Sequence, residues 1–193
     1  PEFREIRKKN SNFINLCLNP NLSEKITLQP IDRFGFDAAI IFSDILMIPY
    51  GLGQKVEFKK YFWPNLGDIN LNELMTLNDS VFSNNLSPIY ELLKSLNKNN
   101  KLKDRDLIGF VGAPWTLLVY MINKVSPKHG LTPSFIENIG LINNLLDVLD
   151  KFIKLHIKNQ VSAGATIIKI FDSWAGLIKN DLEKYLYNPT LSL

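Results

Sequence analysis

Residues 107–112, with the sequence LIGFVG, form a short apolar run that is followed by Ala113 and then by Pro114. A continuous run of this kind is typical of a strand that is buried on both faces, as in a parallel sheet. Proline is favourable in the first turn of a helix, because the N–H that it lacks has no partner there. The stretch therefore predicts a buried strand that passes directly into a helix.

Two further runs resemble the first one, at residues 38–42 (AAIIF) and 166–171 (TIIKIF). Both are apolar and rich in β-branched or aromatic residues, which favours buried strands. The segments between the runs show helical periodicity, and strands that alternate with helices indicate an α/β fold with a parallel sheet.

Six helices are predicted. The first is capped by Ser11 and carries Phe13 and Cys17, and the second runs from Asn19–Pro20 to Gly35. The others are expected over 80–98, over 114–123, from Thr132–Pro133 to about Gln160, and over 177–187. Residues 49–78 are predicted to form a long loop with a small hairpin around Val56–Phe58.

The composition excludes several classes of protein. Of the 193 residues 46% are apolar, which is enough for a core and argues against disorder. No apolar stretch approaches the ~18 residues of a membrane helix, so we expect no membrane association. The net charge is +3 and the lysines are scattered, which does not suggest a nucleic-acid partner. The single cysteine, Cys17, cannot form an internal disulfide, and we expect a cytoplasmic protein.

Chemically useful residues follow each of the three predicted strands. Ser43 and Asp44 follow the first strand, Gly112–Trp115 the second, and Asp172–Gly176 the third. Each group alone is better explained as a helix cap or a turn. In parallel α/β folds, however, the functional site lies beyond the carboxyl ends of the strands. The three groups together therefore indicate one site.

The same segments carry a family resemblance. The chain resembles the uroporphyrinogen decarboxylases of haem biosynthesis, and the similarity runs in order over nearly the whole chain. The matching segments are Pro1–Arg7 (PEFREIR), Leu28–Phe34 (LQPIDRF), Asp37–Leu46 (DAAIIFSDIL), Gly109–Leu117 (GFVGAPWTL), Tyr120–Met121 and Ile170–Gly176 (IFDSWAG).

The resemblance implies a (β/α)8 TIM barrel. Such a barrel takes roughly 250 residues, whereas this chain has 193. We therefore expect residues 1–193 to form a single incomplete TIM-barrel domain, truncated at both ends, with roughly the second to fourth βα units. The family's paired arginines are expected before Pro1, and its substrate histidine in the later half of the barrel.

The resemblance also implies a reaction, carried out by a carboxy-lyase without a metal or an organic cofactor. The family converts uroporphyrinogen III to coproporphyrinogen III by removing the carboxyl groups of four acetate side chains. Loss of CO₂ leaves an electron pair, which a protonated pyrrole ring can accept. A buried carboxylate near the ring N–H groups would stabilise this cation. Asp44 matches the family's aspartate in this role, and family members are homodimers.

Four more residues match family positions at the tetrapyrrole substrate, and each also has a simpler explanation. Tyr120 is expected at substrate carboxylates, or is a core aromatic residue. Ser173 is expected at a substrate carboxylate, or caps a turn. Arg7 would hold the acidic substrate, or is an exposed helix arginine. Phe171 would pack on the macrocycle, or fills the core.

Two places depart from the family pattern. Lys169 stands where a neutral polar residue is usual, and it has the same strand parity as Phe171, so it could face the barrel interior. Residues 61–64 (YFWP) replace an expected glycine-rich turn.

Two alternative hypotheses remain open. One is a zinc- and corrinoid-dependent methyltransferase of the same barrel superfamily, although Cys17, His129 and His156 do not have the spacing of a zinc site. The other is an inactive truncated chain, because an unfinished barrel exposes strand edges and an apolar face. We expect the isolated 193-residue chain to be inactive.

Overall fold

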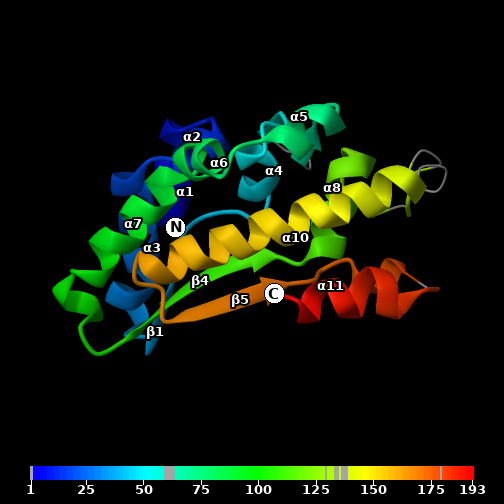
Figure 1. The fold of residues 1–193 in the computed structure, drawn as a ribbon. Coiled ribbons are helices and arrows are strands. Elements are labelled where there is room, and N and C mark those ends of the chain that lie inside the picture. Colours follow the sequence, from blue (N-terminus) through cyan, green and yellow to red (C-terminus); the bar gives the residue numbers. More distant parts are fainter. Residues whose placement is uncertain (1, 59–63, 129, 133–134, 136–138, 179) are drawn as a thin grey trace.

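The computed structural model of the chain describes residues 2–58, 64–128, 130–132, 135, 139–178 and 180–193. Its centre is a parallel sheet of β1 (Ala38–Ile40), β4 (Asp106–Gly112) and β5 (Ile167–Phe171), in the order β1-β4-β5 (Figure 1). These are the three runs predicted from the sequence. The α/β class and the parallel sheet are therefore confirmed.

Helices precede and connect the strands, as parallel pairing requires. Before β1 lie α1 (Glu2–Lys9), α2 (Phe13–Cys17) and α3 (Pro20–Phe34), and Gly35 ends α3 in the left-handed conformation. The remaining elements are α4 (Met47–Gly51), the hairpin of β2 (Val56–Phe58) and β3 (Pro64–Leu66), α5 (Leu71–Thr76), α6 (Asp79–Asn85), α7 (Ser87–Asn97), η1 (Asn100–Leu102), α8 (Pro114–Asn123), α10 (Ile139–Ser162), η2 (Ala175–Leu177), η3 (Glu183–Tyr187, a π-helix) and α11 (Asn188–Leu191).

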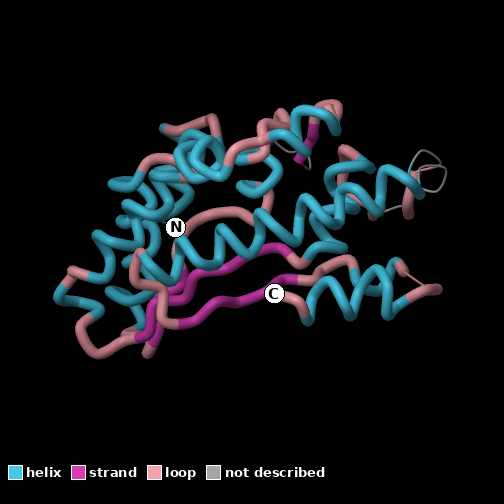
Figure 2. The backbone as a smooth tube through the Cα atoms, in the orientation of Figure 1, coloured by secondary structure: helices cyan, strands magenta, loops and turns pink. Residues whose placement is uncertain are grey.

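The two faces of the sheet differ in what covers them. The long helices lie on one side of the strands (Figure 2), and on that side Ala39, Leu107 and Val111 are buried. On the opposite side Ile40, Ile108 and Ile167 form a row across the strands, in which Ile40 is 55% exposed and Ile167 44% exposed. The prediction of strands buried on both faces is therefore wrong for β1 and β5, because the described helices pack against only one face.

Several predicted helices begin or end elsewhere. The cap of α2 is Asn12 and not Ser11, because the Asn12 side chain accepts a hydrogen bond from the Asn15 N–H. The single helix predicted over 80–98 is two helices, α6 and α7. Pro88 lies in the first turn of α7 and lacks the N–H that would continue the helical hydrogen bonds of α6.

Other differences concern the connections. The predicted loop 49–78 contains α4, α5 and the hairpin, of which only the hairpin was expected. The last predicted helix starts late, since the chain forms a turn at η2 before the π-helix and α11. The stretch 61–63 lies outside the described residues. Pro133 of the helix start predicted at Thr132–Pro133 lies outside them too.

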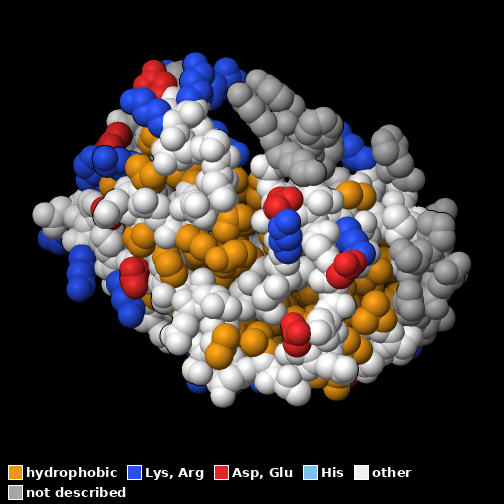
Figure 3. Space-filling model, turned by 90° about the horizontal axis from the view of Figure 1, so that it is seen from above, with side chains coloured by type: hydrophobic (Ala, Val, Ile, Leu, Met, Phe, Trp, Pro, Cys, Tyr) orange, Lys and Arg blue, Asp and Glu red, His pale blue; other side chains and the backbone are white. Residues whose placement is uncertain are grey.

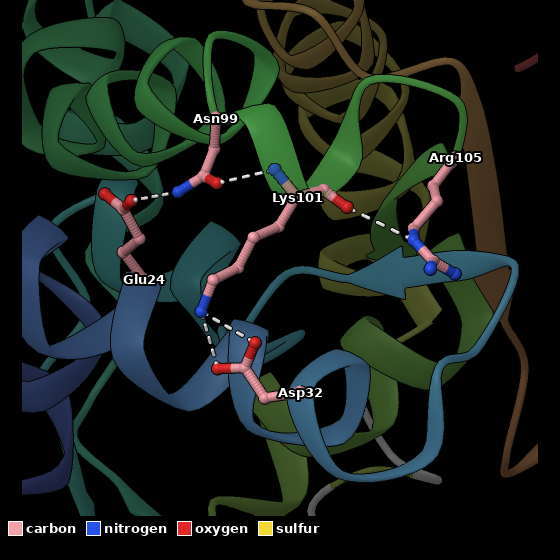
Figure 4. Close-up of polar contacts among 5 residues, drawn as sticks. All are labelled: Glu24, Asp32, Asn99, Lys101 and Arg105. Carbon is pink, nitrogen blue, oxygen red and sulfur yellow. Dashed lines mark hydrogen bonds and ion pairs between the residues drawn. The ribbon is translucent and has the colours of Figure 1, made fainter.

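Polar contacts tie the amino end of the sheet to the helices around it. The Lys101 ammonium binds both carboxylate oxygens of Asp32 at 2.7 and 2.9 Å, and Asn99 donates to Glu24 at 3.0 Å (Figure 4). Arg105 donates to the backbone oxygens of Lys101 and Gly35. These contacts join α3 to the segment that enters β4.

The helix-covered side also carries charged residues at its surface. Acidic side chains lie next to basic ones in the view of Figure 3. The ion pairs at the surface of the helices include that of Lys151 with Asp79 and that of Lys154 with Asp150. In the part of the chain that the structure describes, no helix is long and apolar enough to cross a membrane.

Candidate active site

Asp44 lies in the connection between β1 and α4, just beyond the carboxyl end of β1. Its Oδ1 accepts a hydrogen bond from the Leu46 N–H at 2.8 Å, and its backbone oxygen accepts one from the Met47 N–H at 3.1 Å. Burial raises the pKa of the Asp44 carboxyl to about 6, and the Leu46 N–H opposes this only in part. Among the described residues one N–H donates to this carboxylate, which leaves lone pairs for further donors.

Tyr120 comes from α8, the helix that follows β4, and lies within electrostatic reach of Asp44. Burial raises the pKa of Tyr120, the nearby Trp174 side chain lowers it, and the Asp44 charge raises it. The Tyr120 and Trp174 rings are 6.0 Å apart, nearly edge to face. The carboxyl ends of all three strands thus contribute to one cluster of Asp44, Tyr120 and Trp174.

Phe171 and Ser173 extend this cluster at the end of β5. Phe171 is 36% exposed and packs edge-on against Phe110 with ring centroids 5.5 Å apart. Ser173 is exposed in the turn that follows, where the Ala175 N–H donates to the Asp172 backbone oxygen at 3.3 Å. Both residues are accessible to a ligand.

The Arg7 side chain is held by the backbone that follows its helix, α1. Its Nη1 donates to the backbone oxygens of Asn10 and Ser11 at 2.5 and 2.6 Å, and its guanidinium lies 5.4 Å from the Phe13 ring centroid. Burial raises the pKa of the Cys17 thiol, the Asp44 charge adds to this, and Arg7 opposes it. Arg7 and Asp44 are therefore both near Cys17, although the Arg7 Nη1 is engaged by the backbone.

Thr116 and Asp172 meet beside the cluster, and neither was among the residues expected at the substrate. The Thr116 hydroxyl donates to Asp172 Oδ1 at 2.7 Å and accepts from the Trp174 N–H at 3.0 Å. The available signal was their position, since Asp172 follows β5 directly and Thr116 lies in the first turn of the helix after β4.

Lys169 borders the cluster at Phe171, whereas His156 takes no part in it. The Lys169 ammonium is 5.9 Å from the Phe171 ring centroid, on the face of the sheet away from the helices. His156 is buried between helices, where its Nδ1 is 2.9 Å from the Tyr90 hydroxyl, and His129 is outside the described residues. Among the described side chains, no three His, Cys, Asp or Glu residues gather as a metal site would require.

Comparison with known proteins identifies the family. The family described as uroporphyrinogen decarboxylase (URO-D) matches residues 1–190. The chain belongs to the uroporphyrinogen decarboxylase family. The uroporphyrinogen decarboxylase of Mesorhizobium japonicum is 42% identical over 181 residues, which cover 92% of this chain and 52% of that protein. The one from Rickettsia bellii is 40% identical and covers 98% of this chain and 56% of that protein. The chain thus spans about half the length of these decarboxylases.

A solved structure supports the fold of this family member. A methyltransferase from Methanosarcina mazei superposes with a TM-score of 0.65 over 92% of this chain and 56% of that chain. The two sequences are only 19% identical, so this likeness concerns the fold alone.

Proposed function

We propose that this chain is part of a uroporphyrinogen decarboxylase, which converts uroporphyrinogen III to coproporphyrinogen III without a metal or an organic cofactor. The family membership supports this reaction, and the observation that carries it is the environment of Asp44. Its carboxylate is desolvated, accepts a hydrogen bond from Leu46 and lies at the carboxyl end of the sheet. A group of this kind stabilises a cation that forms against it.

The proposed step requires a positive charge on the pyrrole. A proton is added to the ring, the bond between the acetate methylene and its carboxyl group breaks, and CO₂ leaves. The electron pair of that bond flows into the protonated ring. A second proton then converts the methylene carbon to a methyl group, and the ring loses the first proton. The net change replaces one carboxylate by one hydrogen, and Asp44 stabilises the cation by accepting hydrogen bonds from the pyrrole N–H groups.

The neighbouring residues suit a substrate with many carboxylates. Tyr120 and Ser173 carry hydroxyl groups that could donate to these carboxylates, and Phe171 offers an accessible apolar ring for the macrocycle. Arg7 supplies positive charge at the edge of the cluster. Asp44 carries the chemistry in this proposal, and the other four hold the substrate.

The architecture proposed for the protein follows the same family. The three parallel strands with their helices are assigned to roughly the second to fourth βα units of one TIM-barrel domain. The active protein is proposed to be a cytoplasmic homodimer. A methyltransferase function is not favoured, because the likeness to the Methanosarcina mazei enzyme extends to the fold only. Zinc analysis of the full-length protein tests that alternative directly.

Replacement of Asp44 in the full-length protein tests the proposal. We expect Asp44→Asn to lower the rate of coproporphyrinogen formation by about 100- to 1,000-fold, the usual effect of removing an electrostatic stabiliser of the transition state. The variant should fold, since an asparagine oxygen can still accept from the Leu46 N–H.

Asp106→Asn is the matched control for this experiment. Asp106 is exposed at the amino end of β4, so its variant should keep its rate within about twofold. A wild-type rate in Asp44→Asn would remove Asp44 from the mechanism. A full-length wild-type protein without decarboxylase activity would overturn the proposed function.

A further inference from the structure

The hydroxyl of Thr116 joins two chain segments that carry different parts of the candidate site. It donates to Asp172 Oδ1 at 2.7 Å, across 56 positions of sequence, and accepts from the Trp174 backbone N–H at 3.0 Å. Thr116 lies in the first turn of α8, and Asp172 and Trp174 lie on either side of Ser173. One hydroxyl thus holds both neighbours of Ser173.

Two more hydrogen bonds join the same segments. The Trp115 indole N–H donates to the Trp174 backbone oxygen at 3.0 Å, and the Ala113 N–H donates to the Phe171 backbone oxygen at 2.8 Å. The turn that presents Ser173 is therefore bound to the start of α8 at several points. Because α8 also carries Tyr120, the position of Ser173 relative to Tyr120 depends on these contacts.

The Thr116 hydroxyl has a function that an apolar side chain of the same shape cannot replace. Burial raises the pKa of the Asp172 carboxyl, and the hydrogen bond from Thr116 lowers it. Without the hydroxyl, the Asp172 carboxylate and the Trp174 N–H would each lose a partner in a partly buried place, which is costly. The turn would then move to satisfy these groups with solvent.

We propose that Thr116 and Asp172 are positioning residues, which fix Ser173 relative to Tyr120 so that both hydroxyls meet the carboxylates of one substrate molecule. This inference rests on the proposed function for the identity of the substrate. Neither residue touches the substrate itself. They act through the turn that carries Ser173.

The same sheet contains a matched threonine–aspartate pair at its other end. The Thr166 hydroxyl donates to Asp106 Oδ1 at 2.9 Å and accepts from the Leu107 N–H at 3.0 Å. This pair also joins β4 to the β5 segment, at the opposite end of the strands from the candidate site. Its hydroxyl likewise contacts one aspartate oxygen and one backbone N–H, with the Leu107 oxygen as a further acceptor at 3.3 Å. It provides an internal control for the loss of a hydroxyl with this bonding.

The experiment compares Thr116→Val, Thr116→Ser and Thr166→Val in the full-length protein. We expect Thr116→Val to lower kcat/KM for uroporphyrinogen by up to about a hundredfold, mainly through a higher KM, as small misplacements of binding groups do. Thr116→Ser keeps the hydroxyl and should restore most of kcat/KM. Thr166→Val should lower the melting temperature and leave KM unchanged. If Thr116→Val changes only the melting temperature, as Thr166→Val does, the positioning role is wrong.

Amide hydrogen exchange at Trp174 gives a readout that does not depend on activity. The Trp174 N–H should exchange faster in Thr116→Val than in the wild type and in Thr116→Ser, because only valine removes its acceptor. Unchanged exchange in Thr116→Val would overturn the inference, whatever the catalytic result. Faster exchange in a protein without decarboxylase activity would confirm the Thr116 contact and refute the proposed function instead.

Discussion

The two ends of the β4–β5 strand pair carry the same kind of bridge in different surroundings. At the amino end, Thr166 binds Asp106, and at the carboxyl end Thr116 binds Asp172. Asp106 is exposed, whereas burial raises the pKa of Asp172. The same kind of threonine–aspartate hydrogen bond thus involves a solvated aspartate at the amino end and a partly desolvated one at the carboxyl end.

The charged groups around the two bridges follow the same division. Near the amino end, Lys101 is paired with Asp32, and both side chains are about half exposed (Figure 4). At the carboxyl end, the Asp44 carboxyl is desolvated with a raised pKa. In TIM-barrel proteins the amino end of the strands supports stability and the carboxyl end carries the chemistry. The desolvated Asp44 carboxylate at the carboxyl end is therefore expected to lower stability, unlike the solvated ion pair at the amino end.

Replacement of two buried tyrosines gives the strongest test of whether the carboxyl end of the strands carries the chemistry. Tyr120→Phe, at the carboxyl end, should lower kcat/KM by about 10- to 100-fold, because a hydrogen bond to a charged group contributes about 1.5–3 kcal/mol. Tyr90→Phe, between the helices, should leave kcat/KM unchanged. It should lower the free energy of unfolding by about 1 kcal/mol, through loss of the hydrogen bond with His156. Steady-state kinetics and urea unfolding measure both effects, and equal kcat/KM in the two variants would contradict the division.

The stability of Asp44→Asn provides the next test. Above pH 6 the Asp44 carboxyl is ionised in both the folded and the unfolded chain, but in the folded chain it is desolvated. Asp44→Asn should therefore be more stable than the wild type at pH 7, by about 1–2 kcal/mol. A one-unit change in pKa corresponds to about 1.4 kcal/mol, and the partial exposure of Asp44 reduces the value expected from the full shift.

The pH dependence of this difference follows from the raised pKa. Between about pH 6 and pH 4 the folded wild type takes up a proton at Asp44 while the unfolded chain does not, so the advantage of Asp44→Asn should shrink. Urea unfolding of both proteins at several pH values measures this. A variant less stable than the wild type at pH 7 would show that the carboxylate is not desolvated.

The smallest effect is expected at the amino end. Removal of the Lys101–Asp32 ion pair should change the free energy of unfolding by about 0.2–1 kcal/mol, because exposed pairs contribute little. A double-mutant cycle of Lys101→Ala and Asp32→Ala isolates this contribution, and kcat/KM should stay at the wild-type value. A loss of activity in either variant would contradict the distinction between the two ends.

Much of the candidate site could be located from the sequence because its parts follow strands. Asp44 and Ser173 each follow an apolar run, whereas Tyr120 was expected from the family resemblance alone. In the structure Tyr120 lies near Asp44, and its ring packs against that of Trp174, the residue after Ser173. The Thr116–Asp172 bond could not be predicted in this way. It joins residues 56 positions apart, and no local pattern indicates which polar groups will meet across a sheet.

The sequence by itself determined the three strands, their alternation with helices, the family and the identity of the candidate residues. Local patterns suffice for these, because strand and helix periods and motif blocks extend over only a few residues. Only the tertiary structure decided which face of each strand is covered, so that Ile40 and Ile167 are exposed although their strands read as buried. It also decided that Asp44 is desolvated and that one threonine hydroxyl fixes the turn at Ser173. These properties depend on contacts between distant segments and on exclusion of water, which become defined only when the chain is packed.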